Sequence, residues 1–432
     1  MRVIEPLGRE DIEILRLETP SVAGHTLKIA VLRASAGARR PDVDAVRRRI
    51  AQRLPRAPQL RCKLGEGRRG GATAWVDDRA FDIHEHVRRL PVREPVSERG
   101  VEDVVARVME ERLDRARPLW TLDVLDRTVG GDVWLIWKLH HAMADGVTAL
   151  RFADAVLWDS PTGAGPLAPA VATRRFGRLG EVLSARRPGR LPAVLRRELH
   201  RSHEPSPFDG AIGRARSVAF ASAPLGALKR AAKALDGTAT VNDVVLALVA
   251  GALRRSARGA RVGGVRVRVP VRLQAPSERP ALANRGSFFV VALPVEELDA
   301  VQRLRRICAD TARCKRGDDP YVLDTLASDL ARFAPPLRRA VQRLEGHPRA
   351  FALDVSNIAG PVERPTVLGA PVRAFYTVGE IGERHGLRVA VVSMADELSF
   401  GLCADPTIVP DLGPLVSGLR AEATALLDAA RP

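Results

Sequence analysis

Two adjacent histidines and a nearby Asp-Gly pair form the part of the sequence best suited to chemistry. The run His140-His141-Ala-Met-Ala-Asp145-Gly146 follows a strongly apolar segment and precedes an amphipathic one. Histidine accepts and returns a proton near neutral pH more readily than other side chains. Asp145, four residues after His141, could face the histidine ring or fix the loop through an ion pair. The pattern therefore predicts a proton-transfer site at the end of a strand.

The segments around this motif predict the elements that must position it. The first half alternates short apolar runs, which indicate strands, with apolar positions at helical spacing, which is typical of an α/β layered unit. Strands are expected at 26–33 and 132–139, and helices at 43–54, 101–113 and 147–157. A strand, a tight turn and a helix start would hold one imidazole rigidly at the edge of a sheet.

The second half predicts a similar α/β unit. Asn242 and Asp243 precede the apolar run 244–253 and suit a helix N-cap, since their side-chain oxygens can accept the unpaired backbone N–H groups of a first turn. Strand-like runs follow at 265–271, 287–293, 352–355 and 387–394. These patterns predict an N-terminal lobe at 1–157 and a C-terminal lobe at 206–432.

The segment 158–205 between the lobes differs in composition. It begins with several Pro and Gly residues and continues as an Arg-rich stretch, 174–201, in which leucines and valines alternate with arginines. One interpretation is a solvated crossover helix packed on the body of the protein. The other is a basic amphipathic helix that contacts an anionic membrane surface.

Composition narrows the class of protein. The chain has 432 residues, a net charge of +17 and four scattered cysteines without metal-ligand spacing. The charge suits a membrane surface, a phosphorylated substrate or nucleic acid, although a coding bias towards Arg accounts for it equally well. Aromatic residues, at 4%, are too sparse for base stacking, so no nucleic-acid partner is expected. Without a long apolar stretch, we expect a cytoplasmic protein that is at most peripheral at the inner membrane.

The HHxxxDG motif resembles the acyltransferase superfamily of chloramphenicol acetyltransferase and peptide-synthetase condensation domains. Three further blocks are similar to those of its bacterial wax ester synthase/diacylglycerol acyltransferases. These blocks are Pro118-Leu119-Trp120, Asn242-Asp243 and Ser356-Asn357-Ile-Ala-Gly360-Pro361. They occur in the family's order and span nearly the whole chain.

The resemblance implies a fold and a reaction. It implies an α/β protein of two chloramphenicol-acetyltransferase-like lobes with an active-site tunnel between them. His141 would take a proton from an acceptor hydroxyl that attacks a fatty acyl-CoA thioester, with Ser356, Asn357 or Asn242 stabilising the oxyanion. The acceptor would be a long-chain alcohol or diacylglycerol. Acyl-CoA would be a co-substrate, and neither a metal nor another cofactor is expected. The lack of a GxSxG nucleophile elbow agrees with direct transfer.

Two further roles and two rival functions follow from the same resemblance. Asp145 would be structural and pair with Arg61, and Gly146 would support the loop. Ser356-Asn357 could instead be only part of a turn, and Trp120 is expected to pack in the core. The rival functions are an O-acyltransferase for a natural product or glycolipid, and a catalytically silent protein that binds lipid or acyl-CoA.

Overall fold

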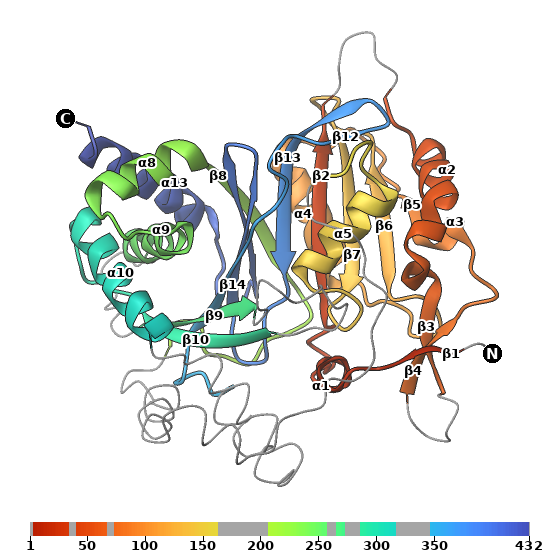
Figure 1. Cartoon of the computed structure of the whole chain (residues 1–432), viewed down its shortest axis with the longest axis horizontal. Coiled ribbons are helices and arrows are strands. Elements are labelled where there is room, and N and C mark those ends of the chain that lie inside the picture. The colour runs from red at the N-terminus through yellow and green to blue at the C-terminus, as the bar shows by residue number, and fades with distance from the viewer. Residues whose placement is uncertain are drawn as a thin grey trace, which may run out of the picture.

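The computed structural model describes residues 3–33, 40–66, 73–162, 206–256, 265–272, 286–316 and 346–431. Two large sheets stand side by side in this part of the chain (Figure 1). Each carries helices, which confirms the predicted pair of α/β lobes. The Arg-rich stretch 174–201 lies outside the described residues. In the described part, no helix is both long and apolar enough to cross a bilayer.

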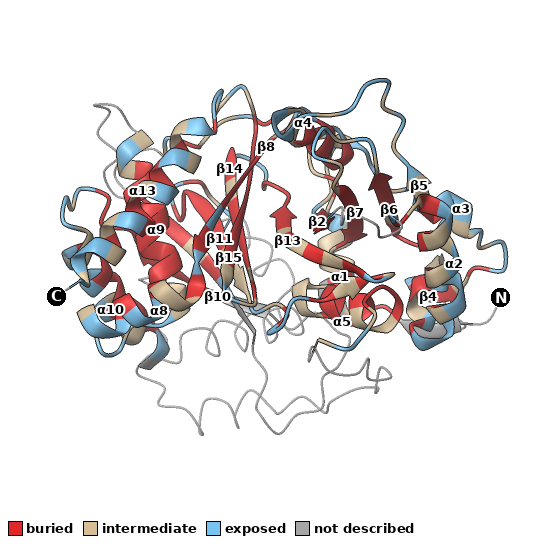
Figure 2. Cartoon of the chain, turned by 90° about the horizontal axis from the view of Figure 1, so that it is seen from above, coloured by how far each residue is buried: buried red, intermediate tan, exposed pale blue. Residues whose placement is uncertain are grey.

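The N-terminal sheet holds the strand that leads into the motif. Its strand order is β12-β13-β2-β7-β6-β5. The strand bounds, in that order, are Thr366–Val367, Ala370–Gly379, His25–Leu32, Val133–His140, Trp120–Leu125 and Val87–Arg89. Every residue of β2 and β7 is buried, because helices cover both faces of the sheet (Figure 2). Helix α4, Glu98–Glu110, packs on one face, and α2, Val43–Arg53, and α5, Gly146–Val156, pack on the other.

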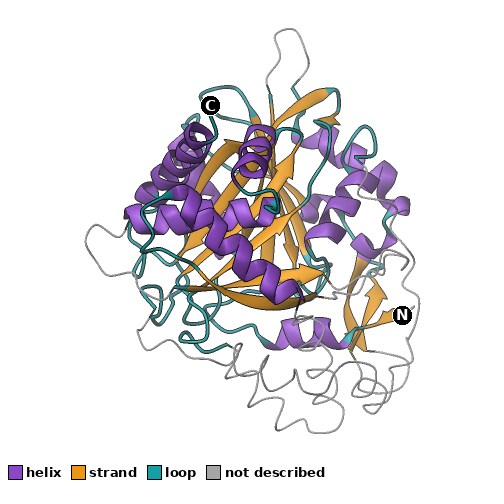
Figure 3. Cartoon of the chain, turned by 60° about the vertical axis from the view of Figure 1, so that its left-hand side comes forward, coloured by secondary structure: helices purple, strands orange, loops and turns teal. Residues whose placement is uncertain are grey.

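The C-terminal sheet has the order β10-β9-β11-β14-β15-β8. Its strand bounds, in that order, are Gly286–Ala292, Arg266–Arg272, Leu353–Ile358, Leu387–Met394, Glu397–Ala404 and Ser217–Pro224. Its outer face is covered by helices, as Figure 3 shows. These helices are α8, Leu225–Leu235, α9, Val241–Ser256, α10, Ala300–Arg316, and α13, Gly413–Ala429. Its inner face meets the N-terminal lobe.

The strand β13 joins the two lobes and corrects the predicted boundary. Residues 206–432 were expected to form one lobe, yet β12 and β13 belong to the N-terminal sheet, where β13 pairs with β2 (Figure 1). The register places Thr377 beside Lys28 and Gly379 beside Thr26. The unpaired backbone N–H and C=O groups at a sheet edge can bond to any strand that packs beside them. The position of β13 in the sequence therefore did not show to which sheet it belongs.

The remaining described elements lie at the N-terminal end. A small sheet has the order β1-β4-β3, with bounds Val3–Pro6, Thr73–Asp77 and Cys62–Glu66. Helices α1, Arg9–Arg16, and α3, Ile83–His86, and two 3-10 turns, Leu54–Arg56 and Pro58–Arg61, lie nearby in the chain. Among the described residues the cysteines are buried free thiols.

Candidate active site

The histidine motif forms a tight turn between β7 and α5. The amides of Met143 and Ala144 both donate to the carbonyl of His140, at 2.9 and 3.1 Å. The amide of His141 donates to the carbonyl of Gly24 at 2.8 Å. The predicted strand, turn and helix start are therefore confirmed, and His141 is fixed by its main chain to the beginning of β2.

Both ring nitrogens of His140 are occupied by hydrogen bonds. Its Nδ1 accepts from the amide of Ala142 at 3.1 Å, so the ring hydrogen lies on Nε2. Nε2 then donates to a carboxylate oxygen of Glu18 at 3.0 Å. These contacts suit a ring that holds the loop in place rather than one that exchanges protons with a substrate.

Asp145 is the N-cap of α5. Its Oδ1 accepts a hydrogen bond from the amide of Thr148 at 2.7 Å, which satisfies an unpaired N–H group of the first turn. A structural role was predicted for Asp145, and the cap is one such role.

The structure gives Arg61 a carboxylate neighbour other than the predicted Asp145. Arg61 ends a 3-10 turn just before β3, and its Nε lies 3.9 Å from Oδ1 of Asp77. Its guanidinium also lies 5.9 Å from the centre of the Phe81 ring. The pairing of β3 with β4 sets Cys62 opposite Asp77 and so brings Asp77 to the neighbouring arginine.

Gly146 meets the end of a strand from the other lobe. A Cβ atom on Gly146 would lie 2.2 Å from Cδ1 of Ile358, the last residue of β11. The absence of a side chain at 146 therefore lets β11 approach the start of α5. The structure thus brings the SNxxGP block to the histidine motif.

Ser356 and Asn357 are strand residues in β11 and not turn residues. Ser356 is opposite Ala390 and Asn357 is opposite Val391 in the neighbouring β14. Successive side chains of a strand point to opposite faces, and Val355 packs in the core of the C-terminal lobe. Asn357 shares that face, whereas Ser356 points towards the N-terminal lobe.

Asn242 and Asp243 lie within the first turn of α9 and not at its cap. The helix starts at Val241, and Thr240 stands before it. The side chain of Asp243 reaches back to the amide and hydroxyl of Thr240, at 2.8 and 2.6 Å, and Thr240 Oγ1 accepts from the amide of Asp243 at 3.4 Å. This reciprocal capping box moves the helix start upstream of the predicted cap.

Two cations beside His141 were not found from the sequence. Lys28 lies in β2, and its Nζ donates to Oγ1 of Thr377 at 2.6 Å. Arg388 lies at the start of β14 and donates to the carbonyl of Glu380 at 3.0 Å. Lys28 left one sequence signal, since it interrupts the otherwise apolar run 27–32. Arg388 resembles many other arginines of the chain and left none.

The surroundings of His141 hold its imidazole in the neutral form. Burial between the lobes lowers the pKa of His141 to about 4, and the charges of Arg388 and Lys28 add to this shift. The carboxylate of Asp145 opposes it. A neutral imidazole is the form that can accept a proton, so His141 is in the right state for a general base at neutral pH.

The lowered pKa values of two histidines, His25 and His141, predict acid sensitivity. Burial lowers the pKa of His25 to about 3 and that of His141 to about 4. The unfolded chain binds these protons below about pH 6.5, whereas the folded chain does not, so the contribution of the two histidines to the free energy of unfolding should be constant above that pH and fall below it. Each histidine should contribute about 1.4 kcal/mol per pH unit within this window. Urea unfolding at pH 7 and pH 5 measures the loss.

A variant pair isolates the contribution of His25. His25→Leu should reduce the pH dependence by about one proton, whereas His84→Ala, which alters an exposed ring, should leave it unchanged. An equal slope in His25→Leu and the parent protein would contradict the assignment to His25.

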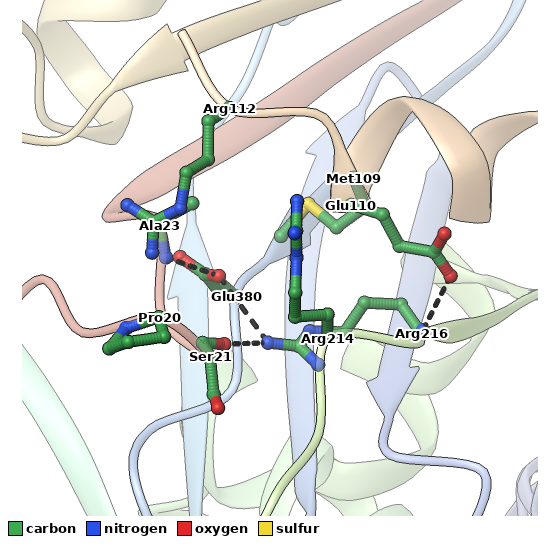
Figure 4. A pocket seen from close by; sticks show the side chains of 9 residues that line it. All are labelled: Pro20, Ser21, Ala23, Met109, Glu110, Arg112, Arg214, Arg216 and Glu380. Atoms are coloured by element: carbon green, nitrogen blue, oxygen red, sulfur yellow. Dashed lines mark hydrogen bonds and ion pairs between the residues drawn. The ribbon is translucent and has the colours of Figure 1, made fainter.

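A buried ion pair connects the end of β13 to the motif loop. Glu380, directly after β13, accepts hydrogen bonds from the amides of Ala23 and Gly24 at 2.7 and 2.5 Å. Its Oε1 lies 3.5 Å from a guanidinium nitrogen of Arg216. Figure 4 shows this pair, with Arg216 also bonded to Ser21. Gly24 donates its amide to Glu380 and accepts the amide of His141 at its carbonyl. Glu380 is therefore connected to the motif loop through the backbone of Gly24.

Trp120 and His86 make structural contacts away from the motif. Trp120 is fully buried, as expected, and its indole donates to the carbonyl of Leu60 at 2.7 Å. The ring of His86 stacks on the Trp120 ring, and its Nδ1 donates to the main-chain carbonyl of Trp120 at 2.7 Å. Among the described residues, no group of three or more His, Cys, Asp or Glu side chains could hold a metal ion.

The sequence matches two protein-family domains. Residues 7–197 match the wax ester synthase/diacylglycerol acyltransferase catalytic domain, and residues 282–426 match the WS/DGAT C-terminal domain. A Mycobacterium tuberculosis protein named as a diacylglycerol O-acyltransferase is 31% identical, with 98% of this chain and 97% of that protein covered. A Mycobacterium bovis protein of the same name is 29% identical, with 88% and 87% covered.

Solved structures share the two-lobed fold. The wax ester synthase/diacylglycerol acyltransferase of Marinobacter aquaeolei has a TM-score of 0.71 and 24% identity, with 98% of this chain and 99% of that chain covered. The starter condensation domain of rhizomide synthetase has a TM-score of 0.60 and 15% identity, with 99% and 96% covered. The chain is an acyltransferase that acts on alcohol or diacylglycerol acceptors, and it belongs to the wax ester synthase/diacylglycerol acyltransferase family.

Proposed function

We propose that the protein transfers a fatty acyl group from acyl-CoA to the hydroxyl of a long-chain alcohol or diacylglycerol, with His141 as the general base. The observation that carries this proposal is the state of the two histidines. His141 is held at the junction of the lobes with its pKa lowered to about 4, which keeps its imidazole neutral. The hydrogen bonds of His140 to Glu18 and Ala142 suit that ring to holding the loop. We therefore assign proton transfer to His141.

The reaction needs no covalent enzyme intermediate. The acceptor oxygen forms a bond to the thioester carbon while His141 takes the hydroxyl proton, and the carbonyl electrons move onto oxygen. When the carbonyl reforms, the carbon–sulfur bond breaks and the imidazolium gives its proton to the CoA thiolate. Ser356, which points towards the N-terminal lobe, is a candidate hydrogen-bond donor to the oxyanion. Asn357, on the opposite face of β11, and Asn242, in the first turn of α9, remain candidates for the same role.

The choice of acyl-CoA rests on relatives. The family to which this chain belongs is named for wax ester synthesis and diacylglycerol acylation. The rhizomide synthetase condensation domain, which shares the fold, was solved in complex with C8-CoA. An acyl donor on CoA is therefore the donor that we propose for this chain.

A substrate panel tests the proposed function. Purified protein is incubated with acyl-CoAs of several chain lengths and with alcohols, diacylglycerol or no acceptor, and free CoA is measured with a thiol reagent. Release should require an acceptor and should yield an ester detectable by mass spectrometry. Binding of acyl-CoA without acceptor-dependent release would instead support a silent lipid-binding protein. Transfer only to a natural product or glycolipid would replace the proposed acceptor.

We further propose that the protein is cytoplasmic and binds peripherally to anionic membrane through the Arg-rich stretch 174–201. Because salt screens charge within about 8 Å at physiological ionic strength and about 3 Å at 1 M, binding should weaken as salt rises. Co-sedimentation should require vesicles that contain anionic lipid. Neutralising several arginines of 174–201 should abolish binding, and unchanged sedimentation would favour a crossover helix packed on the protein.

A further inference from the structure

Lys28 is a buried cation on which two charges act, that of the Asp145 carboxylate and that of the Arg388 guanidinium. The residue is 6% exposed, and within the described part of the chain its one hydrogen bond is to the neutral hydroxyl of Thr377. An ammonium has three donors, so two of them are left without a protein acceptor in the described part. Burial lowers the pKa of Lys28 to about 8, and the charge of Arg388 adds to this shift.

Lys138 provides the comparison on the neighbouring strand. It is also buried in the N-terminal sheet, but its Nζ contacts two carbonyls, of Val108 and Glu111, and lies 3.3 Å from the Glu111 carboxylate. A buried cation normally needs such an anion, because burial removes its solvation. Lys138 therefore contacts three acceptors of its own lobe, whereas Lys28 has a single neutral acceptor, Thr377, among the described residues.

Arg388 brings a second cation to the same place from the other lobe. Its Nη1 donates to a carbonyl, and its Nε is buried with no hydrogen-bond partner in the described structure. The guanidinium fits against β13 because Gly379 has no side chain, where a Cβ atom would lie 2.5 Å from Nε. Arg388 is partly exposed, so some of its surface is accessible to solvent.

Both cations act on the histidine motif. The charges of Arg388 and Lys28 each lower the pKa of His141, and that of Asp145 raises it. The charged groups that face Lys28 are thus Arg388 from β14 and Asp145 and His141 from the motif loop. Neither Thr377 nor Trp137, its partners on the neighbouring strands, carries a charge. The cluster has more positive than negative charge beside the proposed base.

We propose that Lys28 and Arg388 form a cationic subsite that stabilises the negative charge developing on the thioester during acyl transfer. This inference rests on the proposed function. The oxyanion that forms when the acceptor attacks would accept hydrogen bonds from the remaining N–H groups of Lys28 and Arg388. The CoA thiolate that then departs would be stabilised by the same two cations. The cations also disfavour the imidazolium of His141, which speeds return of its proton to sulfur.

Three variants test the subsite in the thiol-release assay. Lys28→Met removes the charge and keeps the length of the side chain, so kcat should fall by about 100-fold with little change in KM, as for the loss of one oxyanion donor. Lys28→Arg should recover most of that loss. Lys138→Met is the matched control, since it removes a buried lysine from the same sheet but not from this cluster. Its kcat should stay within about three-fold of the parent, well below the loss expected for an oxyanion donor.

The pH profile distinguishes chemistry from packing. The kcat of the parent should fall above about pH 8, where Lys28 loses its proton. This alkaline decline should be absent from Lys28→Met and also from Lys28→Arg, because a guanidinium stays protonated. Retention of the decline, or of the parent kcat, in Lys28→Met would overturn the proposal.

A second readout does not depend on turnover. The titration of His141, followed by NMR with labelled histidine, should move to higher pH in Lys28→Met and not in Lys138→Met. An unmoved His141 pKa would refute the cationic subsite whether or not the protein is active. A parent protein with no transferase activity would instead refute the proposed function.

Discussion

His141→Ala should lower acyl transfer by about 10²- to 10⁴-fold, which is the usual contribution of a positioned general base. The loss should appear in kcat, because the variant keeps the lobes that bind donor and acceptor but cannot take the hydroxyl proton. Release of CoA in the presence of a saturating alcohol measures the effect. His141→Ala should remain folded, since the main-chain bond from residue 141 to Gly24 does not use the ring.

His140→Ala is the comparison for this result. It removes the hydrogen bonds to Ala142 and Glu18 that hold the loop, so activity should fall less and stability should fall more than in His141→Ala. Equal activity of His141→Ala and the parent would remove His141 from the mechanism. Greater loss of kcat in His140→Ala would move the base to the first histidine.

Glu380→Ala should cause a large loss of stability together with a loss of activity. Glu380 is buried and takes hydrogen bonds from the amides of Ala23 and Gly24, and Arg216 lies beside it. Removing one partner of a buried ion pair leaves the other charge uncompensated, at a cost of about 3–5 kcal/mol. The free energy of unfolding in urea measures this cost. Because Gly24 also holds His141, kcat of the folded fraction should fall as well.

A double-mutant cycle shows whether the pair itself is responsible. Arg216→Met alone should also be destabilising, and the double variant should lose much less than the sum of the single losses, because neither charge is then left unpaired. The exposed pair Arg384–Asp209 serves as a control, and Arg384→Ala should change stability by at most about 1 kcal/mol. Additive losses at 216 and 380 would show that the two side chains act independently.

The local parts of the fold and site could be predicted from the sequence. The strand that ends in His140, the turn and helix α5 follow from apolar periodicity and from residues that favour turns and caps, and these depend on neighbours within a few positions. The four family blocks also lie in short stretches. They indicate the family, the two lobes and acyl transfer by themselves, because each block is recognisable without knowing what its residues contact.

The tertiary structure decided which distant residues meet at the motif. It placed β13 in the N-terminal sheet, turned Asp145 to its helix cap and gave Arg61 a different neighbour. It also brought Glu380 to Gly24 across 356 positions of sequence, and Arg388 to His141. Spacing along the chain does not encode such contacts, because they depend on which strand fills a sheet edge and how two lobes pack. The sequence by itself determined the chemistry of the motif, and packing between the lobes determined the charges that surround it.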